Sequence, residues 1–252
     1  MPWNPDQYNK FRAERTAPFF DLLALVDVRP ELKVVDLGCG TGELTRRLAD
    51  QLPGSDVLGL DRSMEMLSKS VAFARPGLRF EQGQIEELQG QWDLIFSNAA
   101  LQWLDHHETR IPALWNHLNP GGQLVVQMPT NHDHPSHLLA RELAEGEPFR
   151  AFFPEGGRKP PVLPVEDYAE MLYDLGAVQI TALMKVYPHV LEDASSIVEW
   201  VKGTLLVPYL ERLPAEYGSE FLSLYTRQLS KQLPQKPVFY GFKRVLFAAT
   251  KP

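Results

Sequence analysis

Cysteine and long apolar segments are nearly absent from this sequence. Cys39 is the single cysteine among 252 residues, which excludes an intrachain disulfide and a metal site built from several thiolates of one chain. No stretch reaches the roughly 18 to 20 apolar residues of a membrane-spanning helix. The first residues, MPWNPDQYNKFRAER, are polar where a signal peptide would be apolar. We therefore expect a cytoplasmic protein without a membrane partner.

Positive charge is scarce as well. The chain has 25 Lys and Arg against 32 Asp and Glu, a net charge of −7, and no run of basic residues. Because a nucleic-acid backbone would meet net repulsion, we expect no nucleic-acid partner. A small organic acid is still compatible with this charge, since a few enclosed Arg or Lys side chains act locally while distant charges are screened.

The apolar segments that are present follow a regular order. With 44% hydrophobic and 23% charged residues, the composition is that of a folded globular domain. Short apolar runs alternate with helical patterns, which is typical of parallel βαβ units. Strands are expected at 33–37, 57–60, 79–82, 94–97, 123–128, 178–186 and 238–249, and helices at 43–51, after a cap at Ser63, and at 136–145, 165–175, 194–213 and 216–233.

This order predicts an α/β fold with a doubly wound, mostly parallel sheet of seven strands. The late helices interrupt the strand pattern, so we expect a helical cap at about 192–233, and a helical arm at about 1–28. The chain is expected to form one domain over 1–252, with the arm and the cap as subdomain elements.

The first strand runs into a glycine-rich loop, VVDLGCGTG at 34–42, that precedes a helix. Glycines let a ligand approach the backbone closely, and the helix N-terminus faces the carboxyl end of the strand. A pyrophosphate is disfavoured because Glu43 stands where dinucleotide-binding loops have their third glycine. Asp61 ends the next strand, 25 residues after Asp36 (61 minus 36), where a carboxylate would accept the ribose hydroxyls of a nucleoside. The loop therefore predicts a nucleoside ligand without phosphates.

Three segments together, VVDLGCGTG, GLDRS and DLIFSNAALQWL, resemble the motifs of the class I S-adenosylmethionine-dependent methyltransferases, which have a Rossmann-like fold. The resemblance implies that S-adenosyl-L-methionine is the cofactor and S-adenosyl-L-homocysteine the product. The residues that it implies for cofactor binding are Asp36, Gly38, Cys39, Gly40, Asp61, Arg62, Met66, Gln84, Ile85, Asn98 and Trp103.

The same resemblance implies a part of the cofactor for most of these residues. It places Asp36 and the loop backbone beside the methionine part, Asp61 at the ribose, and Arg62 or Met66 over the adenine. Gln84-Ile85 stands where many members have an acidic residue that accepts a hydrogen bond from the adenine amine, and the amide oxygen of Gln84 can do the same. Two of these residues have a second interpretation, because Asp36 also suits a cap of the next helix and Met66 also suits core packing. Cys39 is expected to be an inert small residue and not a reactive thiol.

A longer resemblance covers nearly the whole chain and is to the trans-aconitate 2-methyltransferase family, whose members esterify a carboxylate of a small tricarboxylic acid. It rests on 3–5, 8, 11 and 13–15, on NAALQW at 98–103, on QMP at 127–129, and on 131, 135–137, 141–142 and 199–201. One departure is Val207, which stands where the family has an arginine in a Leu-Arg-Pro run. The resemblance then implies that Lys202 or another cation holds the substrate carboxylate, or that the acceptor is a different acid.

Acceptor-binding residues are expected among the aromatic and basic side chains. A planar guanidinium within an apolar pocket suits a carboxylate, while core packing or a solvated helix face is the alternative for each candidate. The residues expected to orient the acceptor are Trp103, His137, Trp200 and Arg12, and the wider candidates are Trp3, Tyr8, Tyr209, Arg15, Arg150 and Lys202.

The histidines are too scattered to predict a metal site. His106 and His107 are neighbours that cannot share one helix face, and His132, His134 and His137 lie in a polar segment without acid pairs. A carboxylate acceptor is already charged and needs no general base, so the catalytic residues stay unassigned. Methyl transfer to a hydroxyl, amine or carbon, with His137 as base for an oxygen or nitrogen acid, is the alternative function. A third hypothesis is an S-adenosylmethionine-binding protein without transfer activity.

Overall fold

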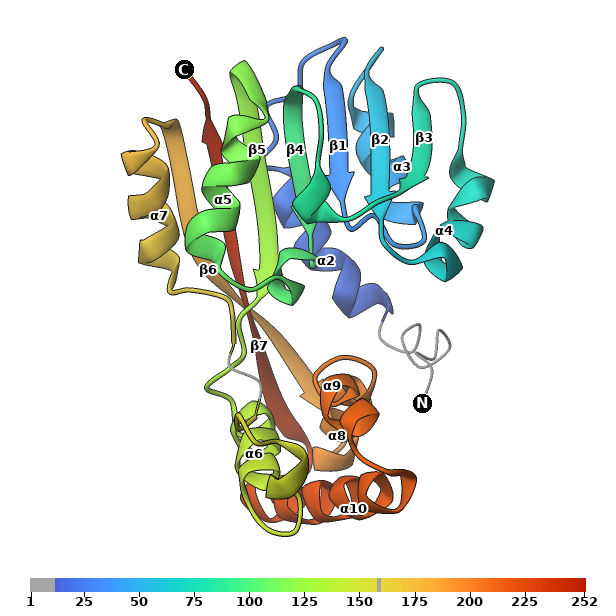
Figure 1. Ribbon diagram of the computed structural model, residues 1–252, viewed down its shortest axis with the longest axis vertical. Helices are drawn as coiled ribbons and strands as arrows, with labels where there is room; N and C mark the ends of the chain where they lie inside the picture. The colour runs from blue at the N-terminus through green and yellow to red at the C-terminus, as the bar shows by residue number, and fades with distance from the viewer. Residues whose placement is uncertain (1–11, 158–159) are drawn as a thin grey trace. The chain divides into compact units, whose positions relative to one another are not determined.

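The computed structural model describes residues 12–157 and 160–252, with the backbone alone for 12–15. The strands of this part form a seven-stranded sheet in the order β3-β2-β1-β4-β5-β7-β6 (Figure 1). Neighbours from β3 to β5 pair in parallel, and β7 pairs with β5 in the antiparallel sense. The strands are β1 (Lys33–Leu37), β2 (Asp56–Asp61), β3 (Leu78–Gln82), β4 (Trp92–Asn98), β5 (Leu118–Pro129), β6 (Val178–Leu191) and β7 (Val238–Thr250). The expected doubly wound, mostly parallel sheet is confirmed.

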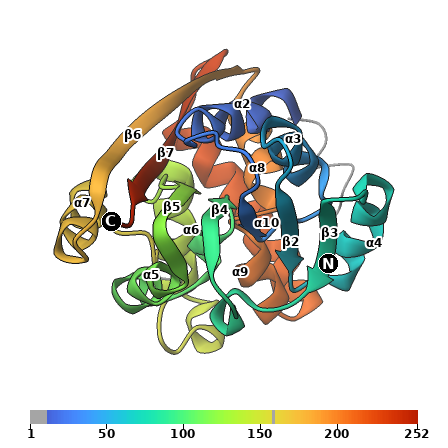
Figure 2. The same cartoon turned by 90° about the horizontal axis from the view of Figure 1, so that it is seen from above.

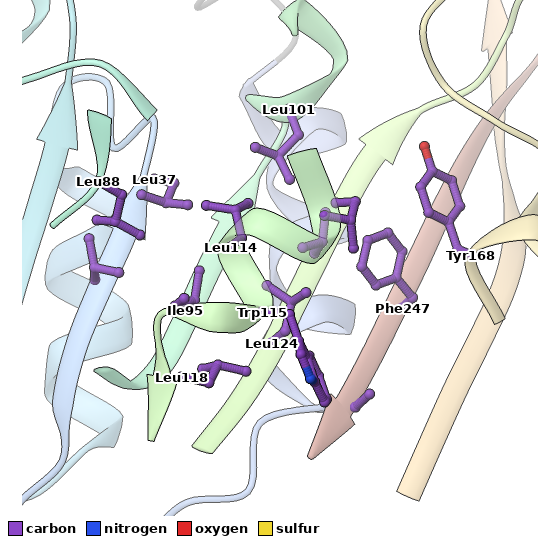
Figure 3. Close-up of a cluster of buried hydrophobic side chains, with 14 of the residues drawn as sticks. Leu37, Leu88, Ile95, Leu101, Leu114, Trp115, Leu118, Leu124, Tyr168 and Phe247 are labelled. Carbon is purple, nitrogen blue, oxygen red and sulfur yellow. The ribbon is translucent and has the colours of Figure 1, made fainter. Parts of the chain in front are cut away.

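The central strands are mostly apolar because helices cover both faces of the sheet. Helices α2 (Arg12–Leu23) and α3 (Glu43–Gln51) lie on one face, and α5 (His107–Asn116) and α7 (Val165–Asp174) lie on the other (Figure 2). Figure 3 shows the core under α5 and α7, where Tyr168 stacks on Phe247 with ring centroids 4.7 Å apart. Helix α4 (Met64–Ser70) begins as expected, because the Ser63 hydroxyl accepts the Met66 N–H at 3.3 Å.

The chain divides into two compact units. The first, which we call the sheet unit, holds Ala17–Pro129, Pro161–Lys185 and Arg244–Pro252. The second, which we call the helical unit, holds Met1–Thr16, Thr130–Pro160 and Val186–Lys243. Its helices are α6 (Pro135–Glu145), α8 (Ala194–Lys202), α9 (Val207–Arg212) and α10 (Ala215–Gln232), and they share an apolar core with the first residues of β7. The segment 192–233 therefore lies in a unit that also includes residues from before β6.

Helix 194–213, expected as one element, is two helices in the structure. Helix α8 ends at Lys202 with Gly203 as its C-cap, and α9 begins at Val207 with Pro208 in its first turn. Proline has no N–H to donate to the preceding turn, so it starts a helix more readily than it continues one. The prediction was wrong because Leu205 and Leu206 keep an apolar pattern through the break.

Some elements were not expected from the sequence. Helix α5 follows β4, and short 3-10 helices lie at η1 (Val71–Phe73), η2 (Ile85–Glu87), η3 (Leu101–Trp103) and η4 (Arg150–Phe152). Within the described residues, no helix combines the length and apolarity required to cross a membrane.

Candidate active site

The glycine loop connects β1 to α3 at the carboxyl end of the central strands. Gly38 has a φ of +77°, and a Cβ built there would lie 2.2 Å from the Cβ of Ala100, so the loop is pressed against the segment that follows β4. Gly40 has a φ of +56°, and a Cβ there would lie 3.5 Å from the methyl carbon of Met66. We call the bare loop backbone and the Met66 side chain that lies beside it the cradle, and the sequence predicts a nucleoside there.

Asp61 ties this loop to the start of α4. One carboxylate oxygen accepts the Gly40 N–H at 2.9 Å, and the other accepts the Ser63 N–H at 2.9 Å. Each carboxylate oxygen has a second acceptor position, so the side chain can also accept ribose hydroxyls. The anchoring of the loop by Asp61 is a role that sequence reasoning did not find.

Asp36 is buried beneath the loop, with 4% of its surface exposed. The Thr45 hydroxyl of α3 donates to its carboxylate at 2.7 Å, but the N-cap of α3 is Gly42 without a side-chain cap bond, so Asp36 does not cap this helix. Burial raises the pKa of Asp36 to about 7, with a smaller rise from the charge of Asp61, while the bond from Thr45 lowers it. Asp36 is therefore protonated in weakly acidic solution.

Replacement of Asp36 by asparagine is expected to change how stability depends on pH. The pKa of Asp36 is about 7 in the folded chain against 3.8 for the free side chain, so between pH 4 and pH 7 the folded state binds more protons than the unfolded state. Stability from this residue therefore falls as pH rises through that window. The free energy of unfolding of the wild type, relative to that of Asp36→Asn, should be lower at pH 8 than at pH 4.5 by on the order of 3 kcal/mol.

Chemical denaturation of both proteins at the two pH values measures this difference. Asp56→Asn is the matched control, because Asp56 lies on the surface at the start of β2 in an ion pair with Arg79. An equal gap between the wild type and Asp36→Asn at both pH values contradicts the raised pKa.

The remaining adenosyl-binding candidates lie around the same loop. Burial and two neighbouring carboxylates raise the pKa of the Cys39 thiol, so Cys39 stays protonated and is not a nucleophile. Arg62 is exposed at the end of β2. The Gln84 amide donates its NH₂ group to Glu87 at 3.0 Å, which leaves the amide oxygen as the group that can meet an adenine amine. Ile85 begins the 3-10 helix η2.

Asn98 and Trp103 flank the turn after β4. Asn98 is the last residue of the strand, Ala99 has a φ of +56°, and the Gln102 amide donates to the Ala99 carbonyl at 2.7 Å. A positive φ at a residue other than glycine is strained and is more frequent at functional sites. Trp103 lies in η3 with 42% of its surface exposed.

His107 is a structural residue of the sheet unit. Its Nε2 lies 2.9 Å from the Leu101 carbonyl, which can only accept, so Nε2 carries the proton and Nδ1 accepts the hydroxyl of Tyr168. Burial lowers the pKa of His107. The neutral ring therefore holds the turn at Leu101 in place.

His137 lies in the helical unit, on α6. Its Nδ1 is 3.1 Å from the Ser136 hydroxyl, which is also 2.8 Å from Nδ1 of His134. Burial lowers the pKa of His137 to about 3 and that of His134 to about 4. A group with so low a pKa is a weak base at neutral pH, which argues against His137 as a general base.

Two aromatic candidates for acceptor binding are core residues of the helical unit. Trp200 has 3% of its surface exposed, and its ring contacts those of His189, Tyr240 and Phe242. Tyr209 is equally buried and stacks on Phe221. Packing of aromatic rings accounts for both positions, and contact of Trp200 with the acceptor stays a prediction.

The basic residues predicted to bind the acceptor differ in their exposure and in their partners. Arg150 is exposed at the start of η4, and Lys202 pairs with Glu199 one turn earlier at 4.0 Å. The Arg12 backbone begins α2. The side chains that lie outside the described residues are those of Trp3, Tyr8, Arg12 and Arg15. In the described part of the chain, no three His, Cys, Asp or Glu side chains gather where a metal ion would need them.

Sequence reasoning missed two buried polar residues beside Asn98. Gln127 of β5 donates to the Asn98 amide oxygen at 2.8 Å, and Arg244 of β7 donates to the Gln127 amide oxygen at 2.8 Å. Gln127 interrupts the apolar run LVVQM of β5, and that interruption is a signal that could have marked it. Arg244 follows Lys243 in β7, so no local pattern sets it apart.

Comparison with known proteins matches the glycine loop and the strands around it to a family. A family model described as "Methyltransferase domain" matches residues 34–122. The structure is similar to that of the YcgJ protein from Bacillus subtilis, with a TM-score of 0.61 and 14% identity over 93% of this chain and 98% of that one. It is also similar to phosphoethanolamine N-methyltransferase 2 of Haemonchus contortus in complex with S-adenosyl-L-methionine, with a TM-score of 0.55 and 16% identity over 94% and 52%.

The fold, the glycine cradle and these similarities define an S-adenosylmethionine-dependent methyltransferase of the Rossmann-like class. Among curated relatives, the trans-aconitate 2-methyltransferase of Deinococcus radiodurans is 52% identical over 100% of this chain and 99% of its own length. That of Variovorax paradoxus is 39% identical over 100% and 99%. The chain belongs to the trans-aconitate 2-methyltransferase family.

Proposed function

We propose that this methyltransferase transfers a methyl group to a carboxylate of a small organic acid, with trans-aconitate as the first acid to consider. The observation that carries the proposal is the 52% identity to a relative of that name over the entire chain. The match extends well beyond the residues 34–122 that the general methyltransferase model covers. It therefore includes the helical unit as well as the strands around the loop.

The titratable groups near the loop suit an acceptor that needs no base. The Asp36 carboxyl is buried and accepts the Thr45 hydroxyl, so it is not open to an acceptor, and burial keeps Cys39 as a thiol. Bound S-adenosylmethionine supplies a methyl group on a positively charged sulfur. A carboxylate is already an anion at neutral pH, so the protein's part is to align it and to exclude water.

The residues that would hold the cofactor follow from the geometry of the loop. Asp61 would accept the ribose hydroxyls while it anchors Gly40, and Met66 would cover the nucleoside from the α4 side. The amide oxygen of Gln84 would accept a hydrogen bond from the adenine amine.

Incubation with methyl-labelled S-adenosylmethionine and a panel of acids tests the proposal. The panel contains trans-aconitate, its cis isomer, a saturated tricarboxylate and several dicarboxylates, so that double-bond geometry and carboxylate number are varied separately. We expect label in a methyl ester that mild base hydrolyses, which is the product that a carboxylate acceptor gives.

Two results contradict the proposal. Label that is stable to base would indicate a hydroxyl, amine or carbon acceptor. Tight binding of S-adenosylhomocysteine without turnover on any acid of the panel or on a broad metabolite mixture would favour a binding protein without transfer activity.

A further inference from the structure

A row of three polar side chains crosses the sheet beside the glycine loop. Asn98 and Gln127 are direct partners in the register of β4 and β5. Gln127 faces Leu246 on β7, so Arg244 is its diagonal neighbour two residues away along β7. Figure 1 shows these strands side by side, with β5 between β4 and β7. The row therefore runs from Arg244, which lies opposite the last residue of β5, to Asn98, which is the last residue of β4.

Burial makes this row unusual. Gln127 has no exposed surface, and Arg244 has 7% exposed. An apolar side chain of similar size would fill either position without the cost of removing an amide or a guanidinium from water. Polar groups in such a place call for a role other than packing.

The hydrogen bonds in the row have a single direction. A guanidinium can only donate, so Gln127 must turn its amide oxygen toward Arg244. Its NH₂ group then faces Asn98 and donates to the Asn98 amide oxygen, and both bonds measure 2.8 Å. The Asn98 amide is thereby fixed with its oxygen toward the sheet and its NH₂ group away from Gln127. The assignment of oxygen and nitrogen in both amides follows from the arginine.

Asn98 lies beside the cradle. Strands β1 and β4 are parallel neighbours with Asp36 opposite Phe96, so the next residues of both strands lead toward the glycine loop and Asn98 together. Two residues after Asn98, Ala100 is pressed against Gly38. Asn98 is partly exposed, in contrast to Gln127. An NH₂ group in this place can donate to an oxygen of a ligand in the cradle.

We propose that Arg244 is a positioning residue that acts through Gln127 to hold Asn98 as a hydrogen-bond donor to a carboxylate oxygen of a bound ligand. Two carboxylates would come near this position, that of the methionine part of the cofactor and that of the acceptor acid. The acceptor source rests on the proposed function, whereas the cofactor source does not.

Gln127→Glu is the sharpest test, because it retains shape and reverses the direction of the row. The new carboxylate still accepts from Arg244, now as a charge-assisted bond, so the fold is expected to hold. It has no donor for Asn98, which must then turn its NH₂ group inward and its oxygen toward the ligand. We expect the dissociation constant of S-adenosylhomocysteine by calorimetry, or the KM for the acid, to rise about tenfold or more.

Gln123→Glu is the matched control on the same strand. Gln123 is also buried, and its amide accepts the Asp27 N–H and donates to the Leu25 carbonyl, both at 3.0 Å, far from the loop. This variant loses a donor too, so it should lower the melting temperature and leave both binding constants within about twofold of wild type.

Substitutions at Arg244 provide the second arm. Arg244→Met removes the donor and should weaken the same binding constant as Gln127→Glu. Arg244→Lys retains a group that can only donate, so its binding constant should return most of the way from that of Arg244→Met to that of the wild type. A purely structural role of Arg244 would not require this recovery. If Gln127→Glu does not fold, the comparison of Arg244→Met with Arg244→Lys tests the proposal.

The two binding constants show which ligand supplies the carboxylate that Asn98 contacts. A change in S-adenosylhomocysteine binding assigns the cofactor carboxylate, and this result stands whether or not an acid acceptor is found. A change in KM for the acid alone assigns the acceptor. Binding constants within twofold of wild type for Gln127→Glu, or equal losses for Arg244→Met and Arg244→Lys, overturn the proposal.

Discussion

Replacement of Asp61 by asparagine is expected to weaken S-adenosylhomocysteine binding about 100-fold. The two oxygens of Asp61 accept the N–H groups of Gly40 and Ser63, each at 2.9 Å. Asparagine has one oxygen, so its NH₂ group would face one of these N–H groups and release either the loop or the start of α4. Loss of a charge-assisted bond with an unpaired donor left behind costs about 3 kcal/mol, which corresponds to about 100-fold in the dissociation constant. Isothermal titration calorimetry measures it.

Asp56→Asn is the matched control for charge. Asp56 begins the same strand, and its ion pair with Arg79 at 2.6 Å lies on the surface. The substitution removes the same unit of charge, so binding should stay within twofold of wild type because exposed pairs contribute little. A dissociation constant for Asp61→Asn within about threefold of wild type would show that the loop does not depend on this carboxylate.

The elements on both sides of the glycine loop could be predicted because their signals are local. The apolar run of β1, the glycines after it and the helical pattern of α3 adjoin one another, and both elements begin and end at the predicted residues. Asp61 followed from the end of the next strand for the same reason. Glycine, proline and strand periodicity act within a few residues, so a single sequence contains what is needed.

The rest of the site depends on contacts between distant residues. Arg244 and Gln127 are 117 residues apart in the chain, and nothing near either residue specifies the other. The helical unit joins Thr130–Pro160 to Val186–Lys243, so its core is assembled across the intervening strand and helix. Trp200 was predicted to meet substrate because aromatic residues suit a pocket, but the rings that enclose it, among them Tyr240, come from other segments. Burial of this kind is decided by packing and not by local pattern.

Gly38→Ala is expected to unfold the sheet unit or to lower its free energy of unfolding by several kcal/mol. The new Cβ would lie 2.2 Å from the Cβ of Ala100, which is far inside van der Waals contact, and the backbone has a φ of +77°. Overpacking costs about 1 to 3 kcal/mol, and a left-handed backbone adds about 1 to 2 kcal/mol for alanine. Chemical denaturation measures the loss, and calorimetry should show that cofactor binding falls with it, because the loop must move away from the end of β4.

Gly176→Ala separates the cost of the collision with Ala100 from the cost of the left-handed backbone. Gly176 lies in the sheet unit with a φ of +75°, but a Cβ there would meet nothing within 4 Å, so only the backbone cost of about 1 kcal/mol should remain. In the double variant with Gly38→Ala and Ala100→Gly, the colliding Cβ of Ala100 is removed. Stability should then recover toward that of Gly176→Ala. If Gly38→Ala alone is no less stable than Gly176→Ala, the close approach of the loop to Ala100 is not a feature of the protein in solution.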